Sequence, residues 1–358
     1  MRIALDAMGG DNAPAEIVSG AVRFARAHAA HEVVLVGDAE RVRVHLSQHP
    51  PVPVNVTVRH ASQVVEMDED AGAAIRRKKD SSLRVGLQLV RDGEASAFVS
   101  AGHSGAVMAG ALLVLGRLPG VERPAIAALF PSLRTSRRAG RCLLLDAGAN
   151  VECRPGQLGQ WAVMGEAYVR TVLGVERPRV AILANGEEAS KGTALTRAAS
   201  ELLRGSPLDF IGYAEGKDIF SGKADVVVTD GFTGNIVLKT AEGTALGVVG
   251  LIKHAIERSP LPERVGAMLM KPTLLGLRKV VDWAEYGGAP LLGVNGVGIV
   301  AHGRSDAHAI FNALRAAQTT VEAHLQAELG QAIDRAAAWL PNRTGKKGKG
   351  ATEEPFSD

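Results

Sequence analysis

The sequence predicts an α/β protein built on a doubly wound, mainly parallel sheet. Short apolar runs recur along the chain, a glycine-containing loop follows most of them, and helical spacing of apolar residues often comes next. Strands that alternate with helices in this way are typical of a parallel sheet covered by helices on both faces. Ligand sites in such sheets lie in loops beyond the carboxyl ends of the strands, so we expect binding and catalytic residues in these loops.

The first 100 residues contain four of the expected strands. They span Ile3–Ala7, Val33–Gly37, Val54–Val58 and Ala95–Ser100. A helix is expected near Pro14, because proline suits the first helical turn, and another over Ala39–Leu46. A third begins after Asp80 or Ser81, either of which can cap it, and continues through Leu83, Leu87 and Val90.

The rest of the chain adds three strands and two segments of different character. The strands span Cys142–Asp146, Val180–Ala184 and Ala224–Asp230, and Cys142 is expected to be a buried strand thiol. Pro272 is expected to split residues 259–285 into two short helices that form a protruding hairpin. We therefore expect one α/β domain over residues 1–340, with two lobes, and a disordered, Gly/Lys-rich tail over 341–358.

The composition excludes several classes of protein. Aromatic residues are only 4% of the 358, and 41 basic residues nearly balance 38 acidic ones, which argues against a nucleic-acid partner. The only cysteines, Cys142 and Cys153, provide neither a disulfide framework nor a zinc site. There is no signal-peptide pattern, and no apolar run is judged long enough to span a bilayer, so a cytoplasmic protein is expected.

Three glycine loops precede expected helices and predict an anion site. They are residues 8–11, 102–105 and 231–235, and free N–H groups at a helix start favour an anion. His103, Ser104, Thr233 and Asn235 add side-chain donors. A glycine turn before one helix is usually only a turn, but three in one sheet favour phosphate. The P-loop and G-x-G-x-x-G patterns are absent, which argues against a nucleotide-binding site.

Lys191 lies in the loop that follows the strand over 180–184. It could neutralise phosphate or a developing oxyanion, or it could be a surface lysine paired with Glu187 or Glu188. No G-x-S-x-G, H-E-x-x-H or Cys/His cluster occurs, so neither a protein nucleophile nor a metal is expected. Phosphate can itself attack a thioester, in which case the protein needs only to position and stabilise. We therefore expect no bound cofactor.

Two charged or amphipathic segments suggest partners. The run Arg76, Arg77, Lys78 and Lys79 is placed at a helix start, where the dipole disfavours cations, which suggests an anionic partner; a solvated basic turn is the alternative. In residues 259–285, apolar side chains alternate with Arg264, Lys271, Arg278 and Lys279. This pattern suits an interfacial helix pair, although a core or dimer-interface hairpin explains the same spacing; the apolar residues are Val265, Met268, Leu269, Leu274 and Leu277.

Six ordered motifs together resemble one family, the bacterial phosphate acyltransferases (PlsX family) that convert acyl-carrier-protein thioesters to acyl phosphates. The resemblance extends from Met1 to about Leu325. The motifs are Asp6-Ala7-Met8-Gly9-Gly10-Asp11, Ile75-Arg76-Arg77-Lys78-Lys79-Asp80-Ser81-Ser82, Ser100-Ala101-Gly102-His103-Ser104-Gly105-Ala106, Asp146-Ala147-Gly148-Ala149-Asn150, Asn185-Gly186-Glu187-Glu188-Ala189-Ser190-Lys191-Gly192 and Asp230-Gly231-Phe232-Thr233-Gly234-Asn235.

The resemblance implies a fold like that of phosphate acetyltransferase and the isopropylmalate and isocitrate dehydrogenases, assembled as a homodimer. It implies a role at the start of phospholipid synthesis, upstream of a glycerol-3-phosphate acyltransferase that uses acyl phosphate. It also implies peripheral attachment to an anionic membrane surface through residues 259–285, and docking of acyl carrier protein, for which the basic run Arg76–Lys79 is the predicted surface.

The resemblance also directs the choice of site residues. Lys191 and Asn235 match active-site positions of the family, and His103 stands where asparagine is expected in many relatives. The predicted catalytic residues are Lys191, Asn235, His103 and Asp230. The predicted phosphate- or substrate-binding residues are Asp6, Gly9, Gly10, Gly102, Ser104, Gly105, Asn150, Asn185, Thr233 and Gly234.

Two other functions stay open at this point. One is another enzyme of the same fold, either a coenzyme A-dependent phosphate acetyltransferase or a dehydrogenase. A dehydrogenase would need a metal-binding acidic cluster, which the loops do not show. The other is a non-enzymatic, membrane-associated ligand-binding or scaffold protein, which would bind phosphate without turnover.

Overall fold

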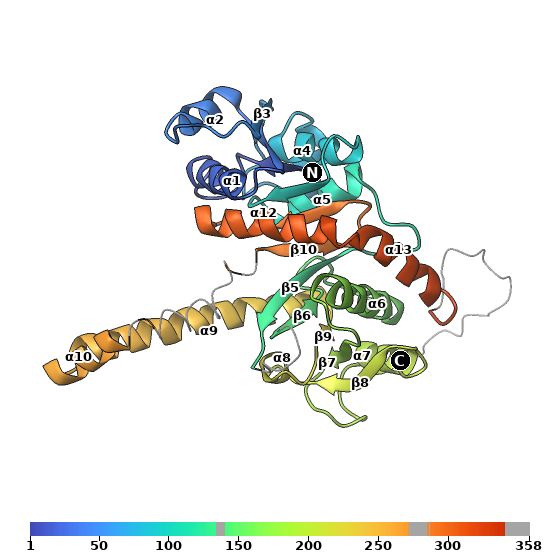
Figure 1. Ribbon diagram of the computed structural model, residues 1–358. Coiled ribbons are helices and arrows are strands. Elements are labelled where there is room, and N and C mark those ends of the chain that lie inside the picture. Colours follow the sequence, from blue (N-terminus) through green and yellow to red (C-terminus); the bar gives the residue numbers. More distant parts are fainter. Residues whose placement is uncertain (134–139, 271, 273–284, 286, 341–358) are drawn as a thin grey trace.

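Eleven strands form a single sheet in the computed structural model, which describes residues 1–133, 140–270, 272, 285 and 287–340. Their order is β3-β2-β1-β4-β11-β10-β5-β6-β9-β7-β8. The molecule has two lobes, with α12 in the first and α13 in the second, and a long helical arm projects from it (Figure 1). The predicted α/β class is therefore confirmed.

The first lobe is a parallel sheet covered on both faces. Because alternate strand residues face opposite sides, Ile3 and Leu5 pack on one face and Ala4 on the other. Its strands are β1 (Arg2–Asp6), β2 (Glu32–Gly37), β3 (Val56–His60), β4 (Ala97–Ser100) and β11 (Val297–Val300). Its helices are α1 (Ala15–Ala27), α2 (Ala39–Leu46) and α12 (Ala307–Glu322) on one face, and α3 (Ala71–Arg77), α4 (Ser82–Arg91) and α5 (Ser104–Val114) on the other.

The second lobe repeats this arrangement with a separate apolar core. Trp161 is fully buried in it and donates its indole N–H to the carbonyl oxygen of Arg123 at 2.9 Å. The parallel strands are β6 (Arg141–Leu145), β9 (Val226–Val228), β7 (Arg179–Leu183) and β8 (Asp209–Ala214). The helices are α6 (Pro155–Val172), α7 (Ala194–Arg204), α8 (Asp218–Ser221) and α13 (Leu325–Ala336).

Two antiparallel strands, β5 (Ala125–Pro131) and β10 (Ala289–Leu292), join the lobes and position the site. β10 pairs antiparallel with β11 and with β5, and β5 pairs antiparallel with β6. The two parallel groups therefore run in opposite directions. Val300 at the end of β11 is opposite Ala289, and Leu145 at the end of β6 is opposite Ala127. The carboxyl ends of both groups consequently meet near the middle of β5.

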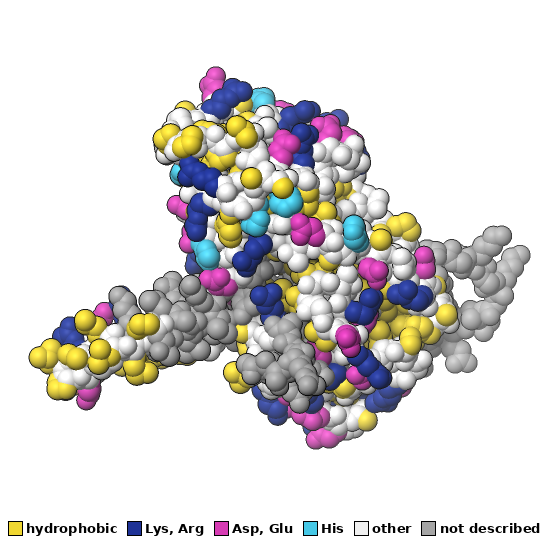
Figure 2. Space-filling view, in the orientation of Figure 1, with side chains coloured by type: hydrophobic (Ala, Val, Ile, Leu, Met, Phe, Trp, Pro, Cys, Tyr) yellow, Lys and Arg dark blue, Asp and Glu magenta, His cyan; other side chains and the backbone are white. Residues whose placement is uncertain are grey.

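The arm consists of α9 (Gly231–Arg258) and α10 (Leu261–Leu269). It begins well before the predicted hairpin, and only Gly231 and Gly234 of α9 are buried. By length and composition α9 could cross a bilayer, so the expectation of no such apolar run was wrong. Leu274, Leu277, Arg278 and Lys279 lie outside the described residues, as does the tail over 341–358. Figure 2 shows apolar side chains gathered at the described end of the arm.

Candidate active site

A cavity of about 190 Å³ lies between the lobes, where the strand ends meet. Its lining combines apolar side chains from β5, β10 and α9 with polar side chains from α5, α9 and the loop after β11. The lining residues are Ser104, Ile126, Ala128, Leu129, Ala147, Gly148, Asn235, Leu238, Lys239, Glu242, Gly288, Ala289, Val300, Ala301 and His302. Of the predicted site residues, the fold thus brings Ser104 and Asn235 into one cavity.

His103 caps α5, and its catalytic role stays a prediction. Its Nδ1 accepts the backbone N–H of Ala106 at 3.2 Å. Asparagine is among the best helix-capping residues, so His103 does here what an asparagine at the same position would do. The next residue, Ser104, is exposed and reaches the cavity from the first turn of α5, where N–H groups have no partner within the helix.

Asp6 lies beneath the glycine loops and does not face the cavity. It is 2% exposed, and it accepts hydrogen bonds from the Ser100 hydroxyl at 2.8 Å and the Met8 N–H at 3.1 Å. Burial raises its pKa, and the hydrogen bonds from its neighbours oppose that rise. A Cβ on Gly9 would lie 2.8 Å from the Gly102 nitrogen. The predicted phosphate-binding residues Asp6, Gly9 and Gly10 therefore hold two loops together.

Backbone N–H groups at the start of α9 already have hydrogen-bond partners within the protein. Asp230 accepts the backbone N–H and the hydroxyl of Thr233, both at 2.8 Å, and the Gly231 N–H bonds the Asn150 carbonyl oxygen at 2.7 Å. These donors are not available to an anion. Asp230 and Thr233 thus cap the helix, and the catalytic role of Asp230 and the phosphate-binding role of Thr233 stay predictions.

The loop after β6 is built around the buried carboxylate of Asp146. This group accepts the Ile126 N–H at 2.9 Å and the Asn150 side-chain amide at 2.9 Å, and burial raises its pKa. Asn150 also bonds the Pro124 carbonyl oxygen at 2.8 Å, so it supports the loop where ligand binding was predicted. A Cβ on Gly148 would lie 3.4 Å from the Asn235 Oδ1, which places Asn235 against this loop.

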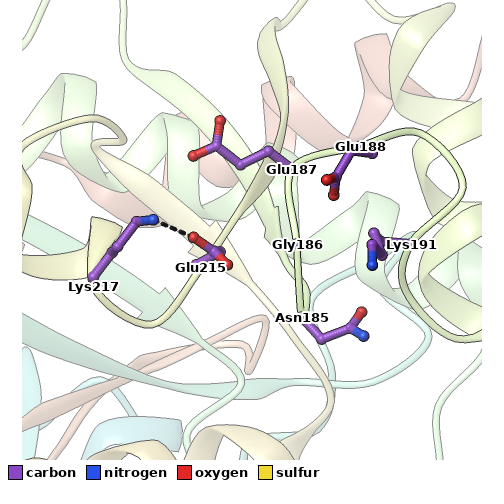
Figure 3. A pocket seen from close by; sticks show the side chains of 7 residues that line it. All are labelled: Asn185, Gly186, Glu187, Glu188, Lys191, Glu215 and Lys217. Atoms are coloured by element: carbon purple, nitrogen blue, oxygen red, sulfur yellow. Dashed lines mark ion pairs between the residues drawn. The ribbon is translucent and has the colours of Figure 1, made fainter.

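Lys191 lines a second, open pocket of about 520 Å³ with Asn185, Gly186, Glu187, Glu188, Glu215 and Lys217 (Figure 3). The Asn185 Oδ1 accepts the Gly192 N–H at 3.0 Å and closes the loop. Glu187 pairs with Lys223 at 2.9 Å, and no ion pair of Lys191 with Glu187 or Glu188 is found in the described part of the chain. The surface-pair interpretation of Lys191 is therefore not supported.

Lys191 and Asn235 do not line the same cavity in this structure. Their loops follow β7 and β9, which are adjacent parallel strands, so both emerge from the same edge of the sheet. Neighbouring strands lie roughly 5 Å apart. The fold therefore brings the two loops to one region, while the two side chains line different pockets.

Glu187, Glu215 and Asp218 have carboxylate oxygens within 4.8 Å of one another. No acidic cluster was expected from the loop motifs, and this group of three carboxylates corrects that expectation. Lys223 lies 2.9 Å from Glu187 and 3.3 Å from Asp218, and Lys217 pairs with Glu215. Lysines thus already supply the positive charge that balances these carboxylates.

The basic run ends a helix, whereas the sequence placed it at a helix start. Arg76 and Arg77 lie in the last turn of α3, where the dipole favours cations, so the argument from electrostatic cost fails. Glu69 accepts Arg77 at 2.7 Å and Lys78 at 2.5 Å. Among the described residues, ion pairs are found for these two members of the run but not for Arg76 or Lys79.

Sequence reasoning missed Lys239, Glu242 and His302, all of which line the cavity. Lys239 follows Asn235 by four residues, so helical spacing could have placed both on one face of α9. His302 follows β11 and precedes Gly303 and a helix capped by Asp306, the same strand–loop–helix pattern that identified the other loops.

Solved structures with the same arrangement define the class of fold. A phosphotransacetylase from Streptococcus pyogenes matches with a TM-score of 0.57 and 20% identity, covering 93% of this chain and 94% of its own. The EutD phosphotransacetylase from Staphylococcus aureus matches with a TM-score of 0.54 and 18% identity, covering 89% and 94%. The protein therefore has the phosphotransacetylase fold, as predicted.

Sequence relatives identify the family within that class. The fatty acid synthesis protein family matches residues 1–328. The chain is 67% identical to the phosphate acyltransferase of Myxococcus xanthus over the full length of both, and 53% identical to that of Anaeromyxobacter sp. strain Fw109-5, over 96% and 94%. The chain belongs to the phosphate acyltransferase family, and the predicted acyltransferase class is confirmed.

Proposed function

We propose that the protein transfers a long-chain fatty acyl group from acyl carrier protein to inorganic phosphate. The observation that supports this is the interlobe cavity, whose lining combines apolar and polar side chains. Ile126, Leu129 and Leu238 suit the acyl chain, while Ser104 at the start of α5 and Asn235 suit phosphate and the reacting carbonyl. The product, acyl phosphate, would serve phospholipid synthesis.

The chemistry requires positioning and charge stabilisation. An oxygen of hydrogen phosphate attacks the thioester carbon, the C–S bond breaks, and the phosphate proton passes to the leaving thiolate. That thiol has an ordinary pKa of roughly 8.5, so it leaves without a strong acid. The Asn235 amide stabilises the tetrahedral oxyanion, and orientation of the two reactants supplies on the order of 7–11 kcal/mol.

The direct test is to incubate the protein with long-chain acyl carrier protein and radiolabelled phosphate, and to measure acyl phosphate. Acetyl-CoA is the matched second donor, because the solved structures of this fold include phosphotransacetylases. Preference for acetyl-CoA would replace the proposal with a phosphate acetyltransferase. Phosphate binding without turnover of either donor would indicate a ligand-binding or scaffold protein.

Lys191→Ala is expected to lower acyl phosphate formation by at least about tenfold, as for the loss of an anion-stabilising donor. Lys191 is free of ion pairs within the described residues and lies in a strand-end loop. The matched control is Lys217→Ala in the same pocket, because Lys217 is paired with Glu215. A folded Lys191→Ala enzyme with unchanged kcat/KM for phosphate would remove Lys191 from the site.

We propose that acyl carrier protein docks near the end of α3. Arg76→Glu with Arg77→Glu is expected to weaken activity on acyl carrier protein much more than on a small acyl thioester, and to flatten its salt dependence. Arg91→Glu is the control, since Arg91 is exposed and pairs only with Asp92 in the described structure. Equal losses on both donors would contradict a docking role.

The arm is proposed to attach the protein to an anionic membrane from the cytoplasm. Met268 and Leu269 on α10 are 74% and 78% exposed, and Val265 is 50% exposed. A homodimer would present two such tips, which bind together more strongly than one. Release at the bilayer would pass acyl phosphate to a membrane glycerol-3-phosphate acyltransferase.

Met268→Glu with Leu269→Glu is expected to abolish most sedimentation with anionic liposomes while activity on soluble substrate survives. Burying a charge at an apolar interface costs far more than the lost contacts alone. Val54→Glu is the control, because Val54 is fully exposed on the first lobe. Continued sedimentation of the double variant, or its dissociation into monomers on ultracentrifugation, would favour a dimer-interface role for the arm.

A further inference from the structure

Gly192, the residue after Lys191, is held through both of its backbone polar groups. Its N–H donates to the Asn185 Oδ1 at 3.0 Å, and its carbonyl oxygen accepts the Arg197 Nη1–H at 2.7 Å. Asn185 begins the loop that follows β7, and Arg197 lies near the start of α7. Two side chains from opposite ends of this loop therefore fix one residue, and we call Asn185 and Arg197 the Gly192 clamp.

The clamp depends on a glycine at its centre. The φ of Gly192 is +82°, a conformation that favours glycine, and a Cβ there would overlap the Thr196 hydroxyl. Arg197 is exposed, and among the described residues it forms this hydrogen bond but no ion pair. Its guanidinium group is thus used on a backbone carbonyl next to Lys191.

The clamp restrains the backbone from which the Lys191 side chain departs. The Lys191 N–H also donates to the Glu188 carbonyl oxygen at 2.9 Å. The aliphatic part of the side chain lies against Gly186, which is buried, because a Cβ on Gly186 would come within 2.9 Å of the Lys191 Cγ. The backbone and the first part of the side chain are therefore positioned, while the ammonium group forms no ion pair with a described residue.

The Lys191 ammonium group stays unpaired in a pocket that contains three glutamates. Lysines already pair with Glu187 and Glu215. Glu188 lies beside Lys191 (Figure 3), and a Cβ on Gly186 would lie only 2.8 Å from the Glu188 Oε2. A lysine has a flexible four-carbon side chain, so a carboxylate this close is an available partner. Restraint of the backbone limits the directions in which that side chain can turn.

We propose that Asn185 and Arg197 are positioning residues for Lys191, which hold Gly192 so that the ammonium group stays away from Glu188 and available to an anionic group of the substrate. This deepens the proposed function and rests on it, because Lys191 is expected there to stabilise negative charge. Neither clamp residue contacts the substrate, so each affects the reaction only when Lys191 is present.

Asn185→Ala and Arg197→Met are each expected to lower kcat/KM for phosphate about five- to tenfold, consistent with the loss of one hydrogen bond. In a Lys191→Ala background, either change should cost less than about twofold, because residues that act through one group are not additive. Arg197→Lys keeps a donor for the Gly192 carbonyl oxygen and should recover most of the activity. Arg204→Met is the control, because Arg204 is exposed in the last turn of α7.

Two outcomes of these assays would contradict the clamp. Full losses in the Lys191→Ala background would show that Asn185 and Arg197 act on the substrate directly or on the whole fold. An Arg197→Lys enzyme as weak as Arg197→Met would show that the hydrogen bond to the Gly192 carbonyl oxygen is not the reason for the loss. Melting temperatures of all variants identify those that fail to fold.

A chemical measurement tests the clamp without the reaction. Only an uncharged amine reacts with acetic anhydride, and pairing with a carboxylate favours the charged ammonium form. Trace acetylation of Lys191, read by peptide mass spectrometry, should therefore slow several-fold in Asn185→Ala and Arg197→Met, while Lys217 in the same pocket is unchanged. Unchanged acetylation of Lys191 in both variants would overturn the clamp. If the wild type forms no acyl phosphate, the proposed function fails, and the acetylation rates still decide on the clamp.

Discussion

Gly234→Ala is expected to reduce acyl phosphate formation by at least about 100-fold and to lower the melting temperature. A Cβ at this position would overlap the carbonyl oxygen of Asp146, and backbone cannot yield as a flexible side chain can. The first turn of α9 would be pushed away from the loop after β6, and Asn235 would move with it. Displacement of a catalytic group by about 1 Å can cost on the order of 10²-fold in rate.

Gly243→Ala provides the matched control in the same helix. A Cβ there meets no atom within 4 Å, and alanine favours a helix over glycine by about 1 kcal/mol. This variant should keep full activity and melt at the same or a slightly higher temperature. Calorimetry gives the melting temperatures of both variants, and the acyl phosphate assay gives their activities. Wild-type kcat and melting temperature in Gly234→Ala would show that α9 need not pack on the Asp146 loop.

Asn235→Ala is expected to lower kcat about 10²- to 10³-fold, the range found when one oxyanion donor is removed. The KM for phosphate should change much less, because the donor acts on charge that develops only in the transition state. Thr240→Ala is the control, since Thr240 is exposed on the following turns of α9. A change confined to KM would assign Asn235 to ground-state binding of phosphate.

The sequence predicted those strands that are buried apolar runs followed by glycine loops. β1, β2, β4, β6, β7 and β9 all lie where such runs occur, within a few residues. β5, β8, β10 and β11 were not assigned. The reversal of direction between the lobes depends on the antiparallel pairing of β10 with β5 and β11, which joins residues more than 150 apart in the first case. Local periodicity contains no signal for such pairing.

The candidate site was predicted less completely, for a chemical reason. Asp, Asn, Thr and His can cap a helix or bind an anion with the same atoms. His103, Asp230 and Thr233 turned out to be engaged at helix starts, and Asn150 within its loop. Only the placement of neighbouring donors distinguishes the two roles. Ser104 and Asn235 were predicted in loops that follow strands, and both line the interlobe cavity, because ligand sites in such sheets lie beyond the carboxyl ends of the strands.

The position of β11 has a consequence for how the chain folds during synthesis. Although β11 belongs to the first lobe, where it pairs with β4, about 200 residues separate the two strands in the chain. At roughly 5–20 residues per second, the ribosome needs about 10–40 s to make that interval. Throughout this time β4 has an unpaired edge, and the face of the sheet that α12 later covers is exposed. The second lobe can therefore complete its strands before the first lobe does, although the first lobe begins the chain.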